Sequence, residues 1–167
     1  MPYSFVNILG LTVGVASVVV IIIWISVETS YDKFHKEGER LYRVGMIFKT
    51  PNMGLDSASI NAPAGPEYKR EFPVVENMVR FDLRAESVIY NDRTTKLQVI
   101  YTDSTFFDMF SFSLVKGDKT SCLNSPTGIV LTDKSSRKIF GAEDPLGKGI
   151  LINGKPFIVT AIAKDPP

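Results

Sequence analysis

The first part of the chain is an uninterrupted apolar segment, and everything after it is polar. No Asp, Glu, Lys, Arg or His occurs between Met1 and Val27, and residues 5–27 form a nearly continuous apolar run of 23 positions. A helix that crosses the hydrocarbon core of a bilayer needs about 20 apolar residues, each rising about 1.5 Å. The pattern therefore predicts a transmembrane helix within residues 1–27.

A cleaved signal peptide and a soluble core helix both fit this segment less well. A signal peptide has Lys or Arg before a shorter apolar stretch and then a small-x-small cleavage site, and residues 25–30 contain no Ala-x-Ala motif. A core helix of a soluble protein has a polar face, whereas residues 18–25 are apolar on every side. They also include Trp24, a residue type that anchors helices at the membrane interface. We therefore expect a span that is retained.

Small and polar residues of the span fall on one side of the helix. At about 100° per residue, four of them lie within a stripe about 80° wide. These four are Asn7, Gly10, Gly14 and Ser17. The two glycines would let a second helix approach closely, and Asn7 would need a hydrogen-bond partner across that contact. The stripe predicts helix packing in the membrane, with the alternative that glycine and serine are simply common in membrane helices.

The residues after the span carry all of the charge, in near balance. All 37 Lys, Arg, Asp and Glu residues follow Val27, and 19 basic against 18 acidic side chains give a net charge of +1. This balance offers no basic patch, and no nucleic-acid-binding motif is present, so we expect no nucleic-acid partner. Neither Gly nor Pro lies between Val15 and Glu37, which predicts that the helix continues past the bilayer as a stalk over residues 28–40.

Residues 41–167 alternate between strand and helix patterns, which predicts an α+β domain. We expect a first strand–helix–strand (βαβ) unit, residues 50–61 as a loop, and two hairpins with turns at residues 91–94 and at Asn153-Gly154. The predicted elements are a strand over 41–49, a helix with Pro63 or Pro66 in its first turn that stops at Pro73, a strand over 75–83, a hairpin over 87–90 and 96–101, a helix over 105–110, a strand over 128–131, a helix over 133–140 and a hairpin over 149–152 and 157–163.

Two finer expectations concern the aromatic residues. Tyr68 and Phe72 are spaced to contact each other along one helix face. Asp103 or Ser104 is expected to cap the helix over 105–110, which turns its phenylalanines, Phe106, Phe107 and Phe110, toward the core.

Candidate catalytic groups are few, and a structural role accounts for each of them more simply. Glu28 with Asp32, and Asp103 with Asp108, could be named as carboxylate pairs, but solvated stalk charges and a helix cap account for them. His35 is the single histidine and is expected to be a surface or interface residue.

Two further motifs also fail as reactive sites. Cys122 is the single cysteine, so it forms no disulfide within the chain, and we expect a buried or idle thiol. Gly141 to Lys148 superficially suggests a phosphate-binding loop, but it has one residue too many and lacks Ser or Thr after the lysine. We therefore predict no catalytic, cofactor or metal site and a protein that is not an enzyme.

Several short motifs occur together in an order that is typical of one family. They are Asn7-Ile8-Leu9-Gly10-Leu11, Ser30-Tyr31-Asp32-Lys33-Phe34-His35, Leu41-Tyr42-Arg43-Val44, Phe72-Pro73-Val74-Val75-Glu76, Asp103 with Phe106-Phe107-Asp108-Met109-Phe110, Gly117-Asp118, Leu131-Thr132-Asp133, Phe140-Gly141 and Asp144-Pro145-Leu146-Gly147-Lys148. In series they resemble the MacB-like periplasmic core domain, with the first transmembrane helix, of FtsX-type ABC transporter permeases. The resemblance covers nearly the whole chain.

This resemblance implies three regions: a transmembrane helix at 1–27, a helical stalk at 28–40, and a MacB-like core domain at 41–167 that is incomplete at its C-terminus. The N-terminus would be cytoplasmic in a bacterial inner membrane, and residues after about 28 would be periplasmic. Such a permease couples a separate ABC ATPase subunit to its extracytoplasmic domain by mechanotransmission or export. Its partners would be the membrane, the ATPase, further permease helices and a second permease copy. Because these permeases carry at least four spans, we expect this chain to be an N-terminal fragment of one.

A different functional class also fits one span followed by an α+β domain. The chain could be a single-span, membrane-anchored extracytoplasmic sensor or ligand-binding domain, in which case a returning helix and a cytoplasmic signalling module would follow. A pilin-like subunit fits less well, because such a subunit needs an acidic residue early in the apolar helix and none precedes Glu28.

Overall fold

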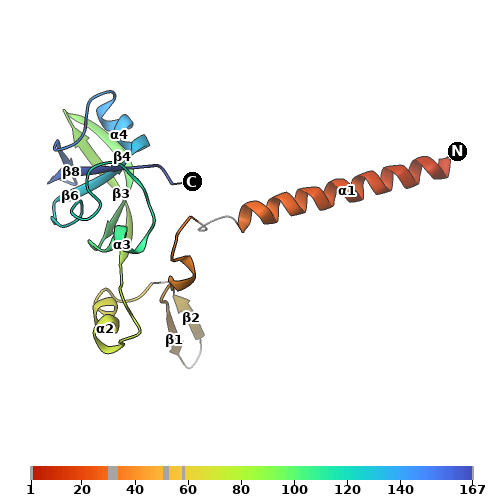
Figure 1. Ribbon diagram of the computed structural model, residues 1–167, viewed down its shortest axis with the longest axis horizontal. Coiled ribbons are helices and arrows are strands. Elements are labelled where there is room, and N and C mark those ends of the chain that lie inside the picture. Colours follow the sequence, from red (N-terminus) through yellow and green to blue (C-terminus); the bar gives the residue numbers. More distant parts are fainter. Residues whose placement is uncertain (1, 30–33, 51–52, 58, 167) are drawn as a thin grey trace. The chain divides into compact units, whose positions relative to one another are not determined.

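The computed structural model describes residues 2–29, 34–50, 53–57 and 59–166, and the chain divides into two compact units, residues 1–38 and 39–167. The long helix α1 (Pro2–Glu28) belongs to the first unit (Figure 1). The elements of the second unit are, in chain order, η1 (Gly38–Arg40, at the boundary), β1 (Met46–Thr50), β2 (Met53–Ser57), α2 (Ala64–Glu71), β3 (Phe81–Tyr90), β4 (Arg93–Thr102), α3 (Phe106–Met109), β5 (Leu114–Lys116), β6 (Gly128–Thr132), α4 (Asp133–Phe140), β7 (Gly149–Ile152) and β8 (Lys155–Ala163).

Helix α1 has the length and composition of a membrane span. It is the one helix among the described residues that is long and apolar enough to cross a bilayer, and its side chains are exposed along its whole length. The helix ends at Glu28, where the amide of Thr29 still bonds to the carbonyl of Ile25 at 2.8 Å. Residues 18–25 of this helix are apolar on every side and so have no polar face to turn toward water, as expected for a span.

The expected stalk over 28–40 differs from what the structure shows after Glu28. Residues 34–37 form turns rather than an α-helix, and η1 is a single 3₁₀ turn. The amide of Gly38 bonds to the carbonyl of His35 in one of these turns, and glycine is a poor helix former. Residues 30–33 lie outside the described residues.

A two-stranded antiparallel sheet forms from β1 and β2, with Met46 opposite Ser57. The strand predicted at 41–49 therefore begins only at Met46, and the loop predicted at 50–61 was wrong because it contains β2. In such a hairpin each strand satisfies the backbone N–H and C=O groups of its neighbour, so a segment with polar composition can still be a strand.

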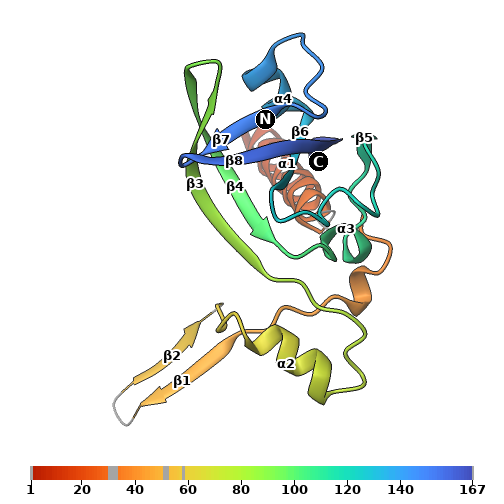
Figure 2. The same cartoon turned by 90° about the vertical axis from the view of Figure 1, so that its left-hand side faces the viewer.

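The larger sheet has six strands in the order β4-β3-β7-β8-β5, and β6 also pairs with β8. Strands β3 and β4, each ten residues long, form a hairpin in which Phe81 lies opposite Thr102 and Tyr90 opposite Arg93 (Figure 2). The strand predicted at 75–83 begins instead at Phe81, and β3 runs on through the segment expected to separate two strands. The turn has two residues rather than the predicted four, because Asn91 and Asp92 both adopt positive φ, 46° and 61°, as a tight hairpin turn requires.

The α+β class is confirmed, but the βαβ unit expected around α2 is not formed. Strand β1 belongs to the small sheet and β3 to the large one. The parallel pairing lies later in the chain, where β6 runs alongside β8 from Gly128 opposite Ile158 to Thr132 opposite Ala163. Helix α4 and strand β7 lie in sequence between these two parallel strands.

Helices α2 and α4 have the predicted extents. Helix α2 stops before Pro73, and the rings of Tyr68 and Phe72 lie 5.8 Å apart, as expected. Helix α4 is capped by Thr132, whose Oγ1 accepts a hydrogen bond from the amide of Ser135 at 3.2 Å, and it ends at Gly141, where φ is 64°. These local caps satisfy backbone groups that a helix leaves unpaired at its ends.

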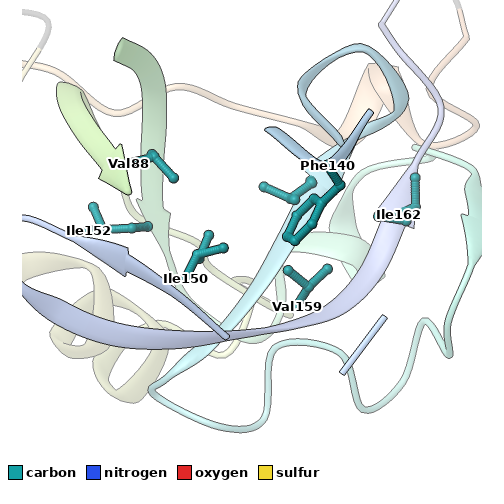
Figure 3. Packing of buried hydrophobic residues seen from close by; sticks show 7 residues of the cluster. Val88, Phe140, Ile150, Ile152, Val159 and Ile162 are labelled. Carbon is teal, nitrogen blue, oxygen red and sulfur yellow. The ribbon is translucent and has the colours of Figure 1, made fainter. Parts of the chain in front are cut away.

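The main core lies between α4 and the large sheet. Phe140 of α4 belongs to a cluster with side chains from β7 and β8, and Figure 3 shows its ring next to Val159, with Val88 and Ile152 farther away. The buried members of this cluster are Val88, Leu131, Phe140, Ile150, Ile152, Val159 and Ile162. The hairpin that carries four of them turns at Asn153-Gly154, with φ of 49° and 77°, so this predicted turn is confirmed.

A second, smaller core cluster lies around α3. Phe107 and Cys122 are buried against Ala161 of β8, and Phe106 packs at their edge. The expectation of a buried thiol is confirmed, and burial raises the pKa of Cys122.

Candidate functional site

The stripe predicted on α1 coincides in part with a shallow groove along the helix. The groove measures about 690 Å³ and is lined by Asn7, Gly10 and Gly14 together with apolar side chains between Val6 and Val19. A Cβ atom added at Gly10 or Gly14 would meet nothing within 4 Å, so the described chain itself gives no reason for glycine there. The groove is therefore a place where a second helix could come close to the α1 backbone.

Ser17 behaves differently from the other three stripe residues. It does not line the groove, and its hydroxyl donates to the carbonyl of Val13 within α1 at 2.8 Å. The one hydrogen-bond donor of its hydroxyl is thus already used inside the helix, as is common for serine and threonine in apolar helices. The helix-packing role predicted for Asn7, Gly10, Gly14 and Ser17 stays a prediction.

In the second unit, the helix cap predicted at Asp103 or Ser104 was wrong. Helix α3 begins after Thr105, with no side-chain cap. The carboxylate of Asp103 instead accepts hydrogen bonds from Arg80 Nε at 2.9 Å, from Arg80 Nη2 at 2.5 Å and from the Arg80 amide at 2.9 Å. Arg80 offers this carboxylate a positively charged donor with two parallel N–H groups, whereas a helix N-terminus would offer it uncharged backbone N–H donors. These hydrogen bonds from Arg80 hold the pKa of Asp103 below its usual range.

The same ion pair joins the segment that carries α2 to the large sheet. Arg80 Nη1 also donates to the carbonyl of Ala62 at 3.3 Å, and Thr105 Oγ1 donates to the carbonyl of Met78 at 2.8 Å. An ion pair between Arg40 and Glu76 connects η1 to this segment. The residues directly after the first unit are thus linked to the segment on which Arg80 lies.

The loop between α4 and β7 superficially suggests a phosphate-binding loop in the sequence. In the structure its lysine already has partners within the chain. Lys148 Nζ pairs with Glu143 and lies 5.8 Å from the ring centre of Tyr90 and 5.6 Å from that of Phe140. Hydrogen bonds from Lys148 lower the pKa of Glu143. Here the lysine fixes the loop to the core through a carboxylate and two rings.

A cavity that sequence reasoning missed opens beside β3. It measures about 510 Å³ and is lined by residues of β3, β4, the β7–β8 turn and the loop before β6. Its polar wall contains Glu86, which is only 6% exposed. The Glu86 carboxylate accepts hydrogen bonds from Tyr101 Oη at 3.2 Å and from Asn153 Nδ2. Burial, followed by the hydrogen bond to Glu86, raises the pKa of Tyr101.

A signal for this cavity was available in the sequence. Glu86, Val88 and Tyr90 alternate along β3, so once the strand is drawn to Tyr90 the glutamate falls on the same face as a core valine. Within the described residues, no group of three or more His, Cys, Asp or Glu side chains is placed to hold a metal ion.

Known proteins resemble this chain over most of its length. The family model for the MacB-like periplasmic core domain matches residues 4–167. A crystal structure described as a domain of a permease protein from Porphyromonas gingivalis is similar, with 23% identity and a TM-score of 0.61, over 69% of this chain and 50% of that chain. The crystal structure of the periplasmic region of MacB from Actinobacillus actinomycetemcomitans is also similar, with 20% identity and a TM-score of 0.51, over 61% of this chain and 49% of that chain.

These likenesses concern the fold. The chain spans about half the length of both solved structures. No curated protein matches it.

Proposed function

Because the chain belongs to the MacB-like periplasmic core domain family, we propose that it is part of the permease subunit of an ABC-type export or mechanotransmission system. Helix α1 spans the bacterial inner membrane with its N-terminus in the cytoplasm, and residues after about 28 lie outside it. A separate cytoplasmic ATPase hydrolyses ATP, and this chain contributes no catalytic group. Its role is to carry the movement of the membrane helices to the extracytoplasmic domain.

One observation carries the proposal: the family match runs without a break from residue 4 to residue 167 and so takes in both α1 and the domain. A helix with the length of a span is followed, after a short connecting segment, by a compact domain. Residues 29–40 connect α1 to the domain, so a movement of α1 that is transmitted through the chain reaches the domain by this segment. The ion pairs Arg40–Glu76 and Arg80–Asp103 give this segment a link to the large sheet.

The groove on α1 supports the proposal that its neighbours in the membrane are further permease helices or a second permease copy. Gly10 and Gly14 leave their sides of the helix open, and Asn7 lines the same groove. In hydrocarbon the Asn7 amide gains most when a neighbouring helix offers it a hydrogen-bond partner.

The membrane orientation is tested by cysteine accessibility in intact spheroplasts. The variant Asp92→Cys places a thiol in the exposed β3–β4 turn, and Ser4→Cys places one at the start of α1. We expect a membrane-impermeant maleimide to label D92C in intact cells and S4C only after permeabilisation. The native Cys122 is buried and gives little background. The reverse labelling pattern would overturn the proposed orientation.

The ATPase partner is tested with the intact protein encoded by the complete reading frame, expressed with its neighbouring genes and purified in detergent. We expect an ATPase with Walker motifs to co-purify and its ATP hydrolysis to change when the permease is present. The matched control is the same ATPase with its catalytic glutamate replaced by glutamine. If the reading frame instead continues into a kinase or cyclase module and no ATPase associates, the chain is a sensor and the transport proposal fails.

A further inference from the structure

The cavity beside β3 has the size and the mixed lining of a small-molecule site. Its volume of about 510 Å³ lies within the range of roughly 300–1,000 Å³ that is usual for ligand pockets. The cavity lies wholly within the second unit and is formed by strands and a hairpin turn of the large sheet together with the loop before β6. Sites of this kind are more rigid than sites built from loops alone.

Glu86 supplies a buried negative charge that no directly bonded cation neutralises. Its two hydrogen-bond donors, Tyr101 Oη and Asn153 Nδ2, are both uncharged. Among the residues that the structure describes, no Lys or Arg forms an ion pair with it. A buried carboxylate without a cation is costly, because neutral donors replace only part of its hydration. The carboxylate retains lone pairs that a ligand ammonium could use.

Lys155 supplies the complementary positive charge. It is the first residue of β8 and lines the same cavity, and its ammonium has no hydrogen-bond or ion-pair partner in the described part of the chain. The other cation at the cavity, Arg84, lies close enough to sense the charge of Glu86, but its guanidinium is paired with Asp82, which accepts a hydrogen bond from Arg84 Nε at 2.8 Å. The cavity therefore has one anion and one cation that lack a charged partner.

Apolar surface completes the lining. The ring of Phe157 is half-buried at the cavity, and the buried side chain of Ile152 forms part of its wall. Such surface stabilises an apolar group by about 25 cal/mol for each Å² that leaves water.

We infer that this cavity binds a small zwitterion, an amino acid or a dipeptide, with its ammonium on Glu86, its carboxylate on Lys155 and its apolar side chain against Phe157. The charges alone favour this class over a simple amine or a simple carboxylic acid, because each of those would leave one of the two protein charges unpaired. The inference does not depend on the proposed permease function, since it rests on the described domain alone.

The test is isothermal titration calorimetry of the intact protein in detergent, with the dipeptide alanyl-phenylalanine as the probe. We expect measurable binding of the free dipeptide and a loss of affinity of about tenfold or more when its amine is acetylated or its carboxylate amidated, because a charge-assisted hydrogen bond contributes about 1.5–3 kcal/mol. Absence of binding at millimolar dipeptide, or equal affinity for the blocked forms, would overturn the inference.

Variants assign the two contacts. Lys155→Met removes the ammonium from an exposed position. It should lower the affinity for the free dipeptide by about tenfold and leave the affinity for the amidated dipeptide unchanged. Lys134→Met, at another exposed lysine outside the cavity, is the matched control and should change neither. Glu86→Gln should lower the affinity for the free dipeptide but not the affinity for the acetylated one. Because E86Q alters a buried network, its fold is checked by circular dichroism, and if it is unfolded the Lys155 variant and the blocked dipeptides still decide the outcome.

Discussion

Arg80 and Asp103 are joined by a two-pronged ion pair that also holds the Arg80 backbone amide, although the two residues lie 23 positions apart in the sequence. The pair links the segment after α2 to the segment before α3. The Asp103 side chain is only 20% exposed, so it is shielded from water more than the paired carboxylates of Asp82, Asp133 and Asp144. We therefore expect the Arg80–Asp103 pair to matter for stability where the exposed pairs do not.

Replacing Asp103 by Asn should lower the melting temperature of the protein in detergent by about 2–8 °C, since about 1–2 kcal/mol is lost and each kcal/mol corresponds to roughly 2–4 °C at this size. Thermal melts followed by circular dichroism give this value. Asp82→Asn is the matched control, because it breaks an exposed Arg–Asp pair with Arg84 and should change the melting temperature little. Equal effects of the two variants would contradict the prediction.

The contribution of Asp103 should also depend on pH in a defined direction. Arg80 lowers the pKa of Asp103 in the folded protein, so the carboxylate stabilises the fold at every pH above its unfolded pKa of about 3.9. This stabilisation is lost as the pH falls through the lower, folded pKa. The difference in melting temperature between wild type and D103N should therefore be constant near neutral pH and shrink below about pH 4. A difference that grows on acidification would contradict the direction of the pKa shift.

On α1, we expect Gly14→Leu or Gly10→Leu to impair assembly with neighbouring membrane helices while the domain stays folded. A Cβ atom added at either position meets no atom of this chain, so any effect must come from a partner. Ala16→Leu is the matched control, because it makes a similar change about 140° around the helix from the middle of the stripe. Cross-linking and size-exclusion chromatography of the intact protein in detergent measure the assembly. Unchanged assembly in G10L and G14L would contradict the predicted helix-packing role of the stripe.

Gly117→Ala should destabilise the domain by about 3 kcal/mol. Gly117 has φ of 96°, which side chains rarely adopt, and an added Cβ would lie 2.5 Å from Ala161 Cβ and 2.7 Å from the Thr160 carbonyl oxygen. Gly149→Ala is the control, because its nearest contact would be 3.9 Å away at an ordinary φ. Thermal melts should separate the two variants clearly, and similar melting temperatures would contradict the close approach of Gly117 to β8.

Cys122 should resist thiol reagents in the folded protein. Its side chain is buried at 2% exposure, and burial raises its pKa, so the reactive thiolate is both rare and inaccessible. We expect the reaction with Ellman's reagent to be slow under native conditions and rapid after denaturation. Because the pKa is raised, moderate alkalinity short of unfolding should accelerate the reaction less than for an exposed cysteine such as that in D92C. Rapid native labelling would contradict the burial.

Elements whose signals are local could be predicted from the sequence, and elements that depend on distant partners could not. Helix α4 has its cap at Thr132 and its stop at Gly141 within one short segment, and the β7–β8 turn is encoded by Asn153-Gly154. Strand β2 and the full length of β3 depend instead on pairing with another strand, which no local pattern specifies.

The same distinction applies to the candidate sites. Glu86 follows two charged residues, Asp82 and Arg84, on the same face of β3, so it looks like a third exposed charge in the sequence. Its hydrogen-bond partner Asn153 lies 67 positions later in the chain. Asp103 looked like a helix cap because its partner Arg80 is distant in sequence. The stripe on α1 could be found because helical periodicity alone places its residues on one side of the helix.

Strand β8 pairs with β5, β6 and β7, yet it is synthesised after all three. Until residue 163 has left the ribosome, these three strands lack the neighbour on which the sheet is built. The preceding hairpin of β3 and β4 can form early, but it has no strand to join on its β7 side until the later hairpin is present. Such dependence on late, non-local pairing slows folding and leaves strand edges exposed during synthesis. The nascent domain should therefore be most in need of chaperones in the interval before β8 arrives.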